Sequence, residues 1–122
     1  MNIKHKTTNL ELTPAIREYL DKKLTSLERF VLDKEALCEV EIGKTTLHHK
    51  AGEIFRAEIN LQIRGTHFRA VAEKEDLLAA IDSVKDDMVR EIQSKKEKRI
   101  NLIRRGGAKI KNMLRGFTDK AE

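Results

Sequence analysis

Apolar residues recur every three or four positions between residues 13 and 30, the spacing of one face of an α-helix. The stripe consists of Ile16, Leu20, Leu24 and Leu27. Thr13 is a favourable N-cap, and Pro14 suits the first helical position, which needs no backbone N–H. The pattern predicts an amphipathic helix that begins after Thr13 and turns its charged residues to solvent.

After a polar turn at residues 33–35, the apolar period falls to two, which is typical of half-buried strands. Three such segments follow one another at residues 38–44, 55–65 and 67–73. Gly65 and Thr66 are expected to form the turn between the last two strands. A further short strand is expected at Asn2–Thr7, at one side of the sheet. The inward positions are expected to be Cys38, Val40, Ile42, Phe55, Ala57, Ile59, Leu61, Ile63, Phe68, Ala70 and Ala72.

The helical period returns at Asp76, which is placed to cap a second amphipathic helix. The apolar stripe of this helix consists of Leu77, Ile81, Val84, Met88 and Ile92. If the helix runs to Arg105, its 30 residues span roughly 45 Å, more than a small sheet can cover. We therefore expect its far end to project, with Gly106 and Gly107 stopping or hinging it. A short amphipathic pattern then follows, formed by Ile110, Met113, Leu114 and Phe117.

The predicted order of elements is β-α-β-β-β-α, which indicates an α+β fold. We expect a two-layer sandwich in which both helices cover one face of a four-stranded sheet. A chain of 122 residues falls in the size range of one domain. We assign residues 1–105 to this domain and residues 106–122 to a basic C-terminal tail.

The positive charge of the chain is concentrated near its C-terminal end. Residues 1–94 carry 15 Lys and Arg against 17 Asp and Glu, whereas residues 95–122 carry 10 against 3. A positive end on a nearly neutral domain favours a polyphosphate partner, because each neutralised phosphate releases a condensed counterion. The alternative interpretation is a solvated, charged end of a helix with no partner.

The residues do not form a pattern that indicates an enzyme, a metal site or a cofactor site. The histidines lack the spacing of zinc ligands, and no serine lies in a nucleophile motif. The histidines are His5, His48, His49 and His67. Cys38 occupies an inward strand position, where we expect a small core residue rather than a nucleophile.

The chain is expected to be cytoplasmic. Its one cysteine cannot form an internal disulfide, and its first ten residues lack the apolar run of a secretory signal. No stretch reaches the ~20 apolar residues that a membrane-spanning helix requires.

The basic end of the second helix is the candidate binding surface. Only five of the residues are aromatic, which argues against stacking on unpaired bases and favours contacts to the phosphates of folded RNA. The outer sheet face carries Glu39, Glu41 and Glu58, so we expect one defined docking site rather than broad binding of RNA.

Two segments resemble the bacterial ribosome hibernation-promoting factor family, which includes the ribosome-associated inhibitor A. They are LTPAIREYLDKKLTSLERF in the first helix and AVAEKEDLLAAID before and within the second helix. The similarity covers residues 1 to about 100. Its most specific elements are Ala72-Glu73, Asp76 and Ala79-Ala80-Ile81-Asp82.

The resemblance implies a fold similar to double-stranded RNA-binding domains. It also implies binding to rRNA of the small ribosomal subunit, between head and body, where the protein overlaps the mRNA and tRNA sites and silences idle ribosomes under stress. The expected partner is therefore the small subunit, with no DNA and no membrane, and the free protein is expected to be monomeric. Long members of the family pair ribosomes through an additional C-terminal domain, whereas the resemblance covers only residues 1 to about 100, so we do not expect this chain alone to pair ribosomes.

The candidate rRNA-binding residues come from two arguments. The resemblance places Lys23, Arg90, Lys96 and Lys98 at basic positions of the family, and the local charge pattern adds Lys85, Lys95 and Arg99. The sequence departs from the family at Leu78, Asp87 and Ser26, where a Tyr and two Lys are common, so we expect the contacts to be shifted towards the helix end.

Two other functions fit the same sequence. One is a protein or membrane interaction module, in which residues 110–117 dock as an amphipathic helix. The other is general binding of double-stranded RNA.

Overall fold

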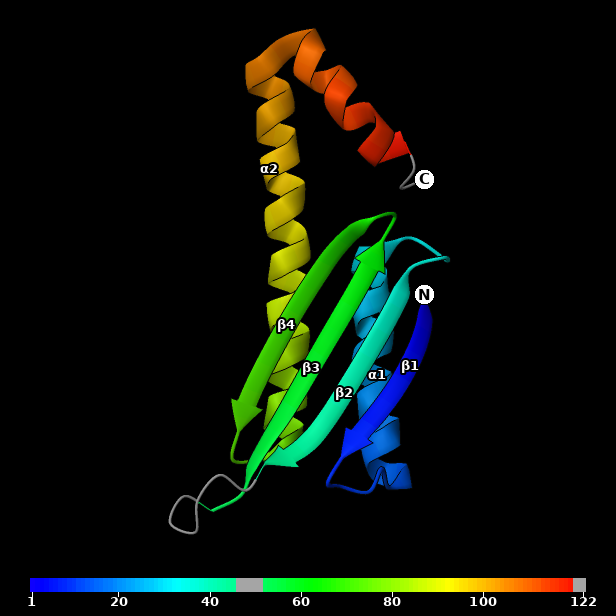
Figure 1. The fold of residues 1–122 in the computed structure, drawn as a ribbon, viewed down its shortest axis with the longest axis vertical. Helices are drawn as coiled ribbons and strands as arrows, with labels where there is room; N and C mark the ends of the chain where they lie inside the picture. Colours follow the sequence, from blue (N-terminus) through cyan, green and yellow to red (C-terminus); the bar gives the residue numbers. More distant parts are fainter. Residues whose placement is uncertain (46–51, 120–122) are drawn as a thin grey trace.

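Two helices cover one face of a four-stranded sheet (Figure 1). The computed structural model describes residues 1–45 and 52–119, and it describes side chains up to Arg104 apart from that of Ile103. The elements are β1 (Asn2–Thr8), α1 (Pro14–Val31), β2 (Leu37–Thr45), β3 (Ile54–Ile63), β4 (Thr66–Lys74) and α2 (Leu77–Asp119). The predicted α+β class and element order are confirmed.

The strands lie in the order β1-β2-β3-β4. β2, β3 and β4 form an antiparallel meander. β1 pairs with β2 in parallel, because the α1 crossover between them returns the chain to the sheet in the same direction. The sheet is therefore mixed, and β1 lies at its edge, where the sequence places it. The two helices run side by side and in the same direction behind the sheet (Figure 1).

The β3–β4 turn differs by one residue from the prediction. Ile63 pairs with Thr66, so the turn consists of Arg64 and Gly65 rather than Gly65 and Thr66. Both turn residues have positive φ, 47° and 83°, as a two-residue hairpin turn that matches strand twist requires. Gly65 adopts this conformation without strain, and Arg64 is held there by an ion pair of 3.5 Å to the buried Asp33.

Both helices begin at the caps that the sequence predicts. The backbone N–H of Ile16 donates to Oγ1 of Thr13 at 3.3 Å, and that of Ala79 donates to Oδ2 of Asp76 at 3.0 Å. Each cap satisfies a backbone donor that has no partner within its helix, which fixes where the chain enters the helix.

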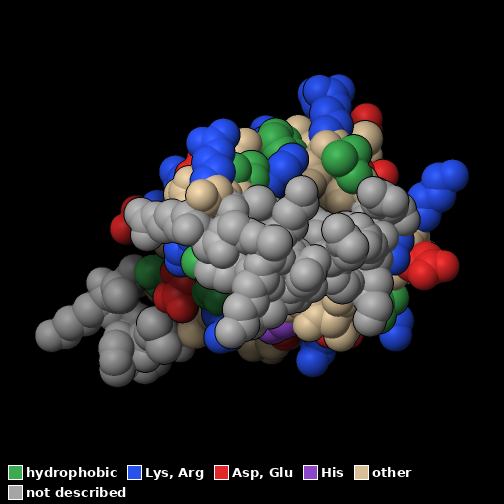
Figure 2. Space-filling model, turned by 90° about the horizontal axis from the view of Figure 1, so that it is seen from above, with side chains coloured by type: hydrophobic (Ala, Val, Ile, Leu, Met, Phe, Trp, Pro, Cys, Tyr) green, Lys and Arg blue, Asp and Glu red, His purple; other side chains and the backbone are tan. Residues whose placement is uncertain are grey.

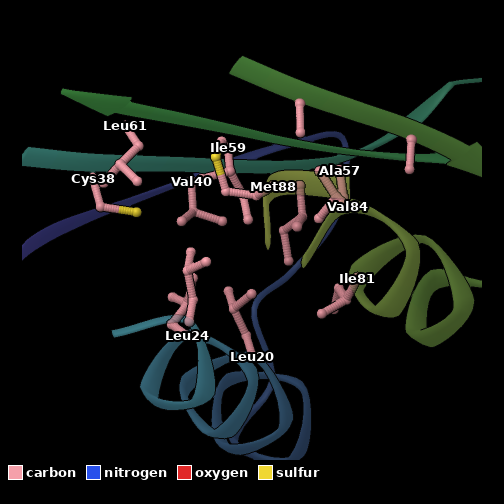
Figure 3. Close-up of a cluster of buried hydrophobic side chains, with 14 of the residues drawn as sticks. Leu20, Leu24, Cys38, Val40, Ala57, Ile59, Leu61, Ile81, Val84 and Met88 are labelled. Carbon is pink, nitrogen blue, oxygen red and sulfur yellow. The ribbon is translucent and has the colours of Figure 1, made fainter. Parts of the chain in front are cut away.

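The core lies between the helices and the sheet (Figure 3). Leu20 and Leu24 of α1 and Met88 of α2 point at the inward side chains of the strands, as Figure 3 shows. All five predicted stripe residues of α2 are buried, and Cys38 is fully buried among apolar neighbours, which raises the pKa of its thiol to about 12. Of the predicted inward strand residues, Phe55 and Ile63 are only partly buried, because they lie near strand ends.

The end of α2 lies beyond the predicted boundary at Arg105. The helix continues through Gly106 and Gly107 to Asp119, and Figure 1 shows it bending in its orange part, beyond residue 100. Each glycine costs a helix only about 1 kcal/mol relative to alanine, so a pair of glycines permits a bend without ending the helix. The side chains of residues 105–122 lie outside the described part, as does the loop with His48 and His49, and a separate tail remains a prediction.

The outer face of the sheet is polar, and Glu58 lies at the centre of its charge network. Its carboxylate accepts hydrogen bonds from Arg56 and Asn60, each at 2.6 Å, and from Arg69 at 3.4 Å. Partial burial acts to raise the pKa of Glu58, but the hydrogen bonds from Asn60, Arg69 and Arg56 outweigh it and lower the pKa to about 2. The positive charges of Arg56 and Arg69 are therefore neutralised within the sheet by Glu58.

The network around Glu58 predicts a pH-dependent stability. Because the folded state lowers this pKa from 4.5 to about 2, the carboxylate stabilises the fold above about pH 4.5, and this stabilisation is lost as the pH falls through that interval. Glu58→Gln is expected to be less stable than the parent near neutral pH and to lose less stability on acidification. Denaturant unfolding at several pH values measures both effects.

Glu39→Gln, on the same face, is the control, because the side chain of Glu39 is exposed and makes no hydrogen bond or ion pair with another described residue. Parallel pH profiles for the parent and Glu58→Gln would show that Glu58 does not have the assigned role.

Candidate nucleic-acid interface

α2 leaves the sandwich after Ile92, which is the last buried residue of its stripe among the described side chains. The C-terminal part of the helix extends past the ends of the strands, as Figure 1 shows. The predicted projection is thus confirmed, and we call the described part of α2 after Ile92 the arm. The arm carries four of the seven candidate rRNA-binding residues, Lys95, Lys96, Lys98 and Arg99.

Lys95 lies against the sandwich, although the sequence places it on the cationic face. Its Nζ lies 4.3 Å from the centroid of the Phe68 ring and donates a hydrogen bond of 2.8 Å to the backbone oxygen of His67. The same ammonium pairs with Oε1 of Glu91 at 3.6 Å. The ammonium thus contacts a ring, a carbonyl and a carboxylate of the protein itself, while its side chain remains 36% exposed.

Arg99 lies on the same line of the helix as Lys95. The two residues follow Ile92 by three and seven positions, so they continue the apolar stripe. Arg99 is partly buried, and burial lowers the pKa of its guanidinium. The sequence already holds the signal that distinguishes Lys95 and Arg99 from the other cations of the arm. Their helical spacing from Ile92 places them on the side of α2 that faces the sheet.

Arg90 and Lys85 lie before the arm and are paired with carboxylates of α2. Nη2 of Arg90 contacts Oδ1 of Asp87, and Nζ of Lys85 lies 3.6 Å from Oδ1 of Asp86. Ion pairs with exposed partners contribute at most about 1 kcal/mol, so a phosphate can compete for either cation.

Lys23 belongs to a contact between the two helices. Oδ1 of Asp82 accepts a hydrogen bond of 2.5 Å from the Tyr19 hydroxyl and lies 3.1 Å from Nζ of Lys23. The hydrogen bond to Asp82 raises the pKa of Tyr19 and also that of Lys23, and the hydrogen bond from Tyr19 lowers the pKa of Asp82. The structure therefore brings Lys23 to the carboxylate that joins α1 to α2.

The side chains of Lys96, Lys98 and Arg104 are exposed and make no hydrogen bond or ion pair with another described residue. Positions two residues apart on a helix are separated by about 200°, so Lys96 and Lys98 lie on opposite flanks of the arm. In Figure 2, which views this end of the molecule, Lys and Arg side chains protrude at separate places with acidic side chains between them. The arm is thus charged on two sides. The sequence interpretation overlooked Arg104.

The described residues hold no group of three or more His, Cys, Asp or Glu side chains that could bind a metal ion. Within the same part of the chain, no helix is both long and apolar enough to cross a membrane.

Comparison with known proteins gives consistent similarities. Residues 3–100 match the family model described as Sigma 54 modulation protein / S30EA ribosomal protein. The chain is 32% identical over 91 residues to the ribosome hibernation promoting factor of Klebsiella oxytoca, an alignment that covers 74% of this chain and 87% of that protein. Its identity to the factor of the same name from Pseudomonas putida is 33% over 101 residues, which covers 83% and 92%.

A solved structure is also similar. The crystal structure of the Thermus thermophilus Protein Y N-terminal domain superposes with a TM-score of 0.61 at 34% sequence identity. The match covers 77% of this chain and 98% of that domain.

The contact between Tyr19 and Asp82 can be tested by titration, because Tyr19 is the one tyrosine of the chain. We expect its phenol to ionise above its ordinary pKa of 10.0 in the parent, and closer to that value in Asp82→Asn, which removes the charge that favours the neutral phenol. Ultraviolet absorbance of the phenolate against pH measures the shift, with circular dichroism to confirm that the fold persists. Asp86→Asn, one turn further along α2, is the control, and equal titration of all three proteins would contradict the assignment.

Proposed function

Because the chain belongs to the Sigma 54 modulation protein / S30EA ribosomal protein family, we propose that it is a ribosome hibernation factor that binds rRNA of the small subunit. The family that the two sequence segments indicate is confirmed by the match over residues 3–100. The proposal concerns binding and not catalysis, and it involves no metal or cofactor.

The exposure of Lys96, Lys98 and Arg104 on the projecting arm is the observation that carries this proposal. These cations have no partner among the described residues, so they can pair with phosphates without first breaking an ion pair. Because they lie on more than one side of the helix, the arm suits a groove with phosphates on both walls better than a flat surface.

Inhibition would follow from the volume that the bound protein occupies. With the arm in contact with rRNA between the head and body of the subunit, the sandwich would block the path of mRNA and the tRNA sites. No bond is made or broken in this mechanism. The protein would act in the cytoplasm as a monomer that binds idle subunits.

The remaining candidate cations would have a secondary role. Lys23, Lys85 and Arg90 each have a carboxylate partner on the protein, and binding would exchange that partner for a phosphate. Such an exchange gains less free energy than the pairing of a cation that has no partner, because one ion pair is lost for each that forms.

The proposal predicts the effect of neutralising the arm. Lys96→Gln/Lys98→Gln is expected to weaken binding to purified small subunits by at least about tenfold at moderate salt, and to lower the slope of log affinity against log salt by about two, one for each lost phosphate contact. Co-sedimentation at several salt concentrations measures both quantities.

The matched control is Lys4→Gln/Lys6→Gln, which removes the same charge from exposed positions of β1. This variant should bind nearly as the parent does. Equal losses in both double variants would mean that only net charge matters, and unchanged binding of the arm variant would refute the proposed interface. A plain RNA duplex that competes as well as the subunit would favour general binding of double-stranded RNA.

A second candidate function is supported by the apolar side chains of the arm. Ile100 and Leu102 are 41% and 44% exposed, which allows the arm to dock on a protein or a membrane surface instead of rRNA. Flotation with liposomes, with and without residues 106–122, distinguishes this function: flotation that requires those residues would favour it over ribosome binding.

A further inference from the structure

Lys95 lies at the point where α2 loses the support of the sandwich. Ile92, one turn earlier, is buried, whereas Lys96 and the residues of the arm that follow are mostly exposed. A helix without tertiary contacts is only marginally stable in water, and its direction varies as it frays or bends. Whatever contacts α2 at this position therefore affects the direction of the whole arm.

The contacts of Lys95 connect α2 to the sheet across 28 residues of sequence. Its ammonium lies over the Phe68 ring and donates to the carbonyl of His67, at the beginning of β4. β4 is an edge strand, so some of its carbonyl groups have no partner in the sheet and can accept such a bond. Phe68 is itself part of the core, which makes this anchor a rigid one.

The charge of Lys95 is also partly compensated on the protein. Glu91, one turn before it on α2, lies 3.6 Å from Nζ. With a ring face, a carbonyl and a carboxylate around it, the ammonium would have to give up several contacts to bind a phosphate. Lys96, the next residue, has no such contacts with described residues and so would lose nothing.

We propose that Lys95 is a positioning residue that fixes the direction of the arm through Phe68 and His67, and that it does not itself bind phosphate. This inference rests on the proposed function and corrects one of its candidate residues. It separates Lys95, which holds the helix, from the exposed cations Lys96, Lys98 and Arg104, which meet rRNA.

The salt dependence of binding separates the two roles. Lys95→Met keeps a long side chain but removes the ammonium that fixes the arm. We expect affinity for the small subunit to fall several-fold because the direction of the arm varies, and the salt slope to stay unchanged because no phosphate contact is lost. Lys96→Met is the matched control, and its slope should fall by about one. Lys95→Arg should restore most of the affinity, because a guanidinium can also stack on the ring and donate to the carbonyl.

The direction of the arm can be measured in the free protein. Spin labels attached to Val71→Cys and Leu102→Cys, both at exposed positions, report the distance from the sheet to the arm, and the buried Cys38 is protected from labelling. We expect a narrow distribution of distances in the labelled parent, in Lys95→Arg and in Lys96→Met, and a broader one in Lys95→Met. Thermal unfolding of each variant checks that the sandwich remains folded.

Two results would overturn the inference: a salt slope that falls by about one in Lys95→Met, or a distance distribution that stays as narrow as that of the parent. If the parent does not bind small subunits at all, the proposed function fails, and the distance distributions still decide whether Lys95 fixes the arm.

Discussion

The burial of the apolar stripe of α2 against the sheet is the constraint on which the rest of the structure depends. From Leu77 to Ile92 every residue of this stripe is buried, and each large aliphatic side chain contributes about 1.5–3 kcal/mol. The next positions on the same line are Lys95 and Arg99, whose charges are costly to bury. Packing therefore stops at Ile92 while the helix continues. The sequence of one stripe thus determines both the core and the start of the arm.

The distribution of charge follows from the same division. Within the sandwich, several cations are held by carboxylates: Glu58 binds Arg56 and Arg69, Asp82 binds Lys23, and the buried Asp33 pairs with Arg64. At the centre of the outer face of the sheet, Arg56 and Arg69 are therefore already engaged by Glu58. On the arm, Lys96 and Lys98 lack such partners among the described residues. A positive end on a neutral domain orients the molecule as it approaches a phosphate surface, which favours a single docking orientation.

Local patterns in the sequence predicted the element order, both helix caps and the second core stripe, because each depends on residues within a few positions of one another. The predicted position of the β3–β4 turn was wrong by one residue. The position depends on which two residues adopt positive φ, and Arg64 does so with help from the distant Asp33. Of the two outcomes expected at Gly106 and Gly107, a stop or a hinge, the stop is wrong, because two glycines weaken a helix without ending it, and the helix bends in this part instead (Figure 1). The orientation of Lys95 depends on β4, which a charge count along the chain does not include.

The most direct test of this account is the structure of the chain bound to the small ribosomal subunit, determined by electron cryomicroscopy. The account predicts that α2 beyond Ile92 lies against rRNA, with the side chains of Lys96 and Lys98 near phosphates and that of Lys95 still over Phe68. The outer face of the sheet, centred on Glu58, should face away from the RNA. An arm that points into solvent, with rRNA packed on the outer face of the sheet, would contradict it.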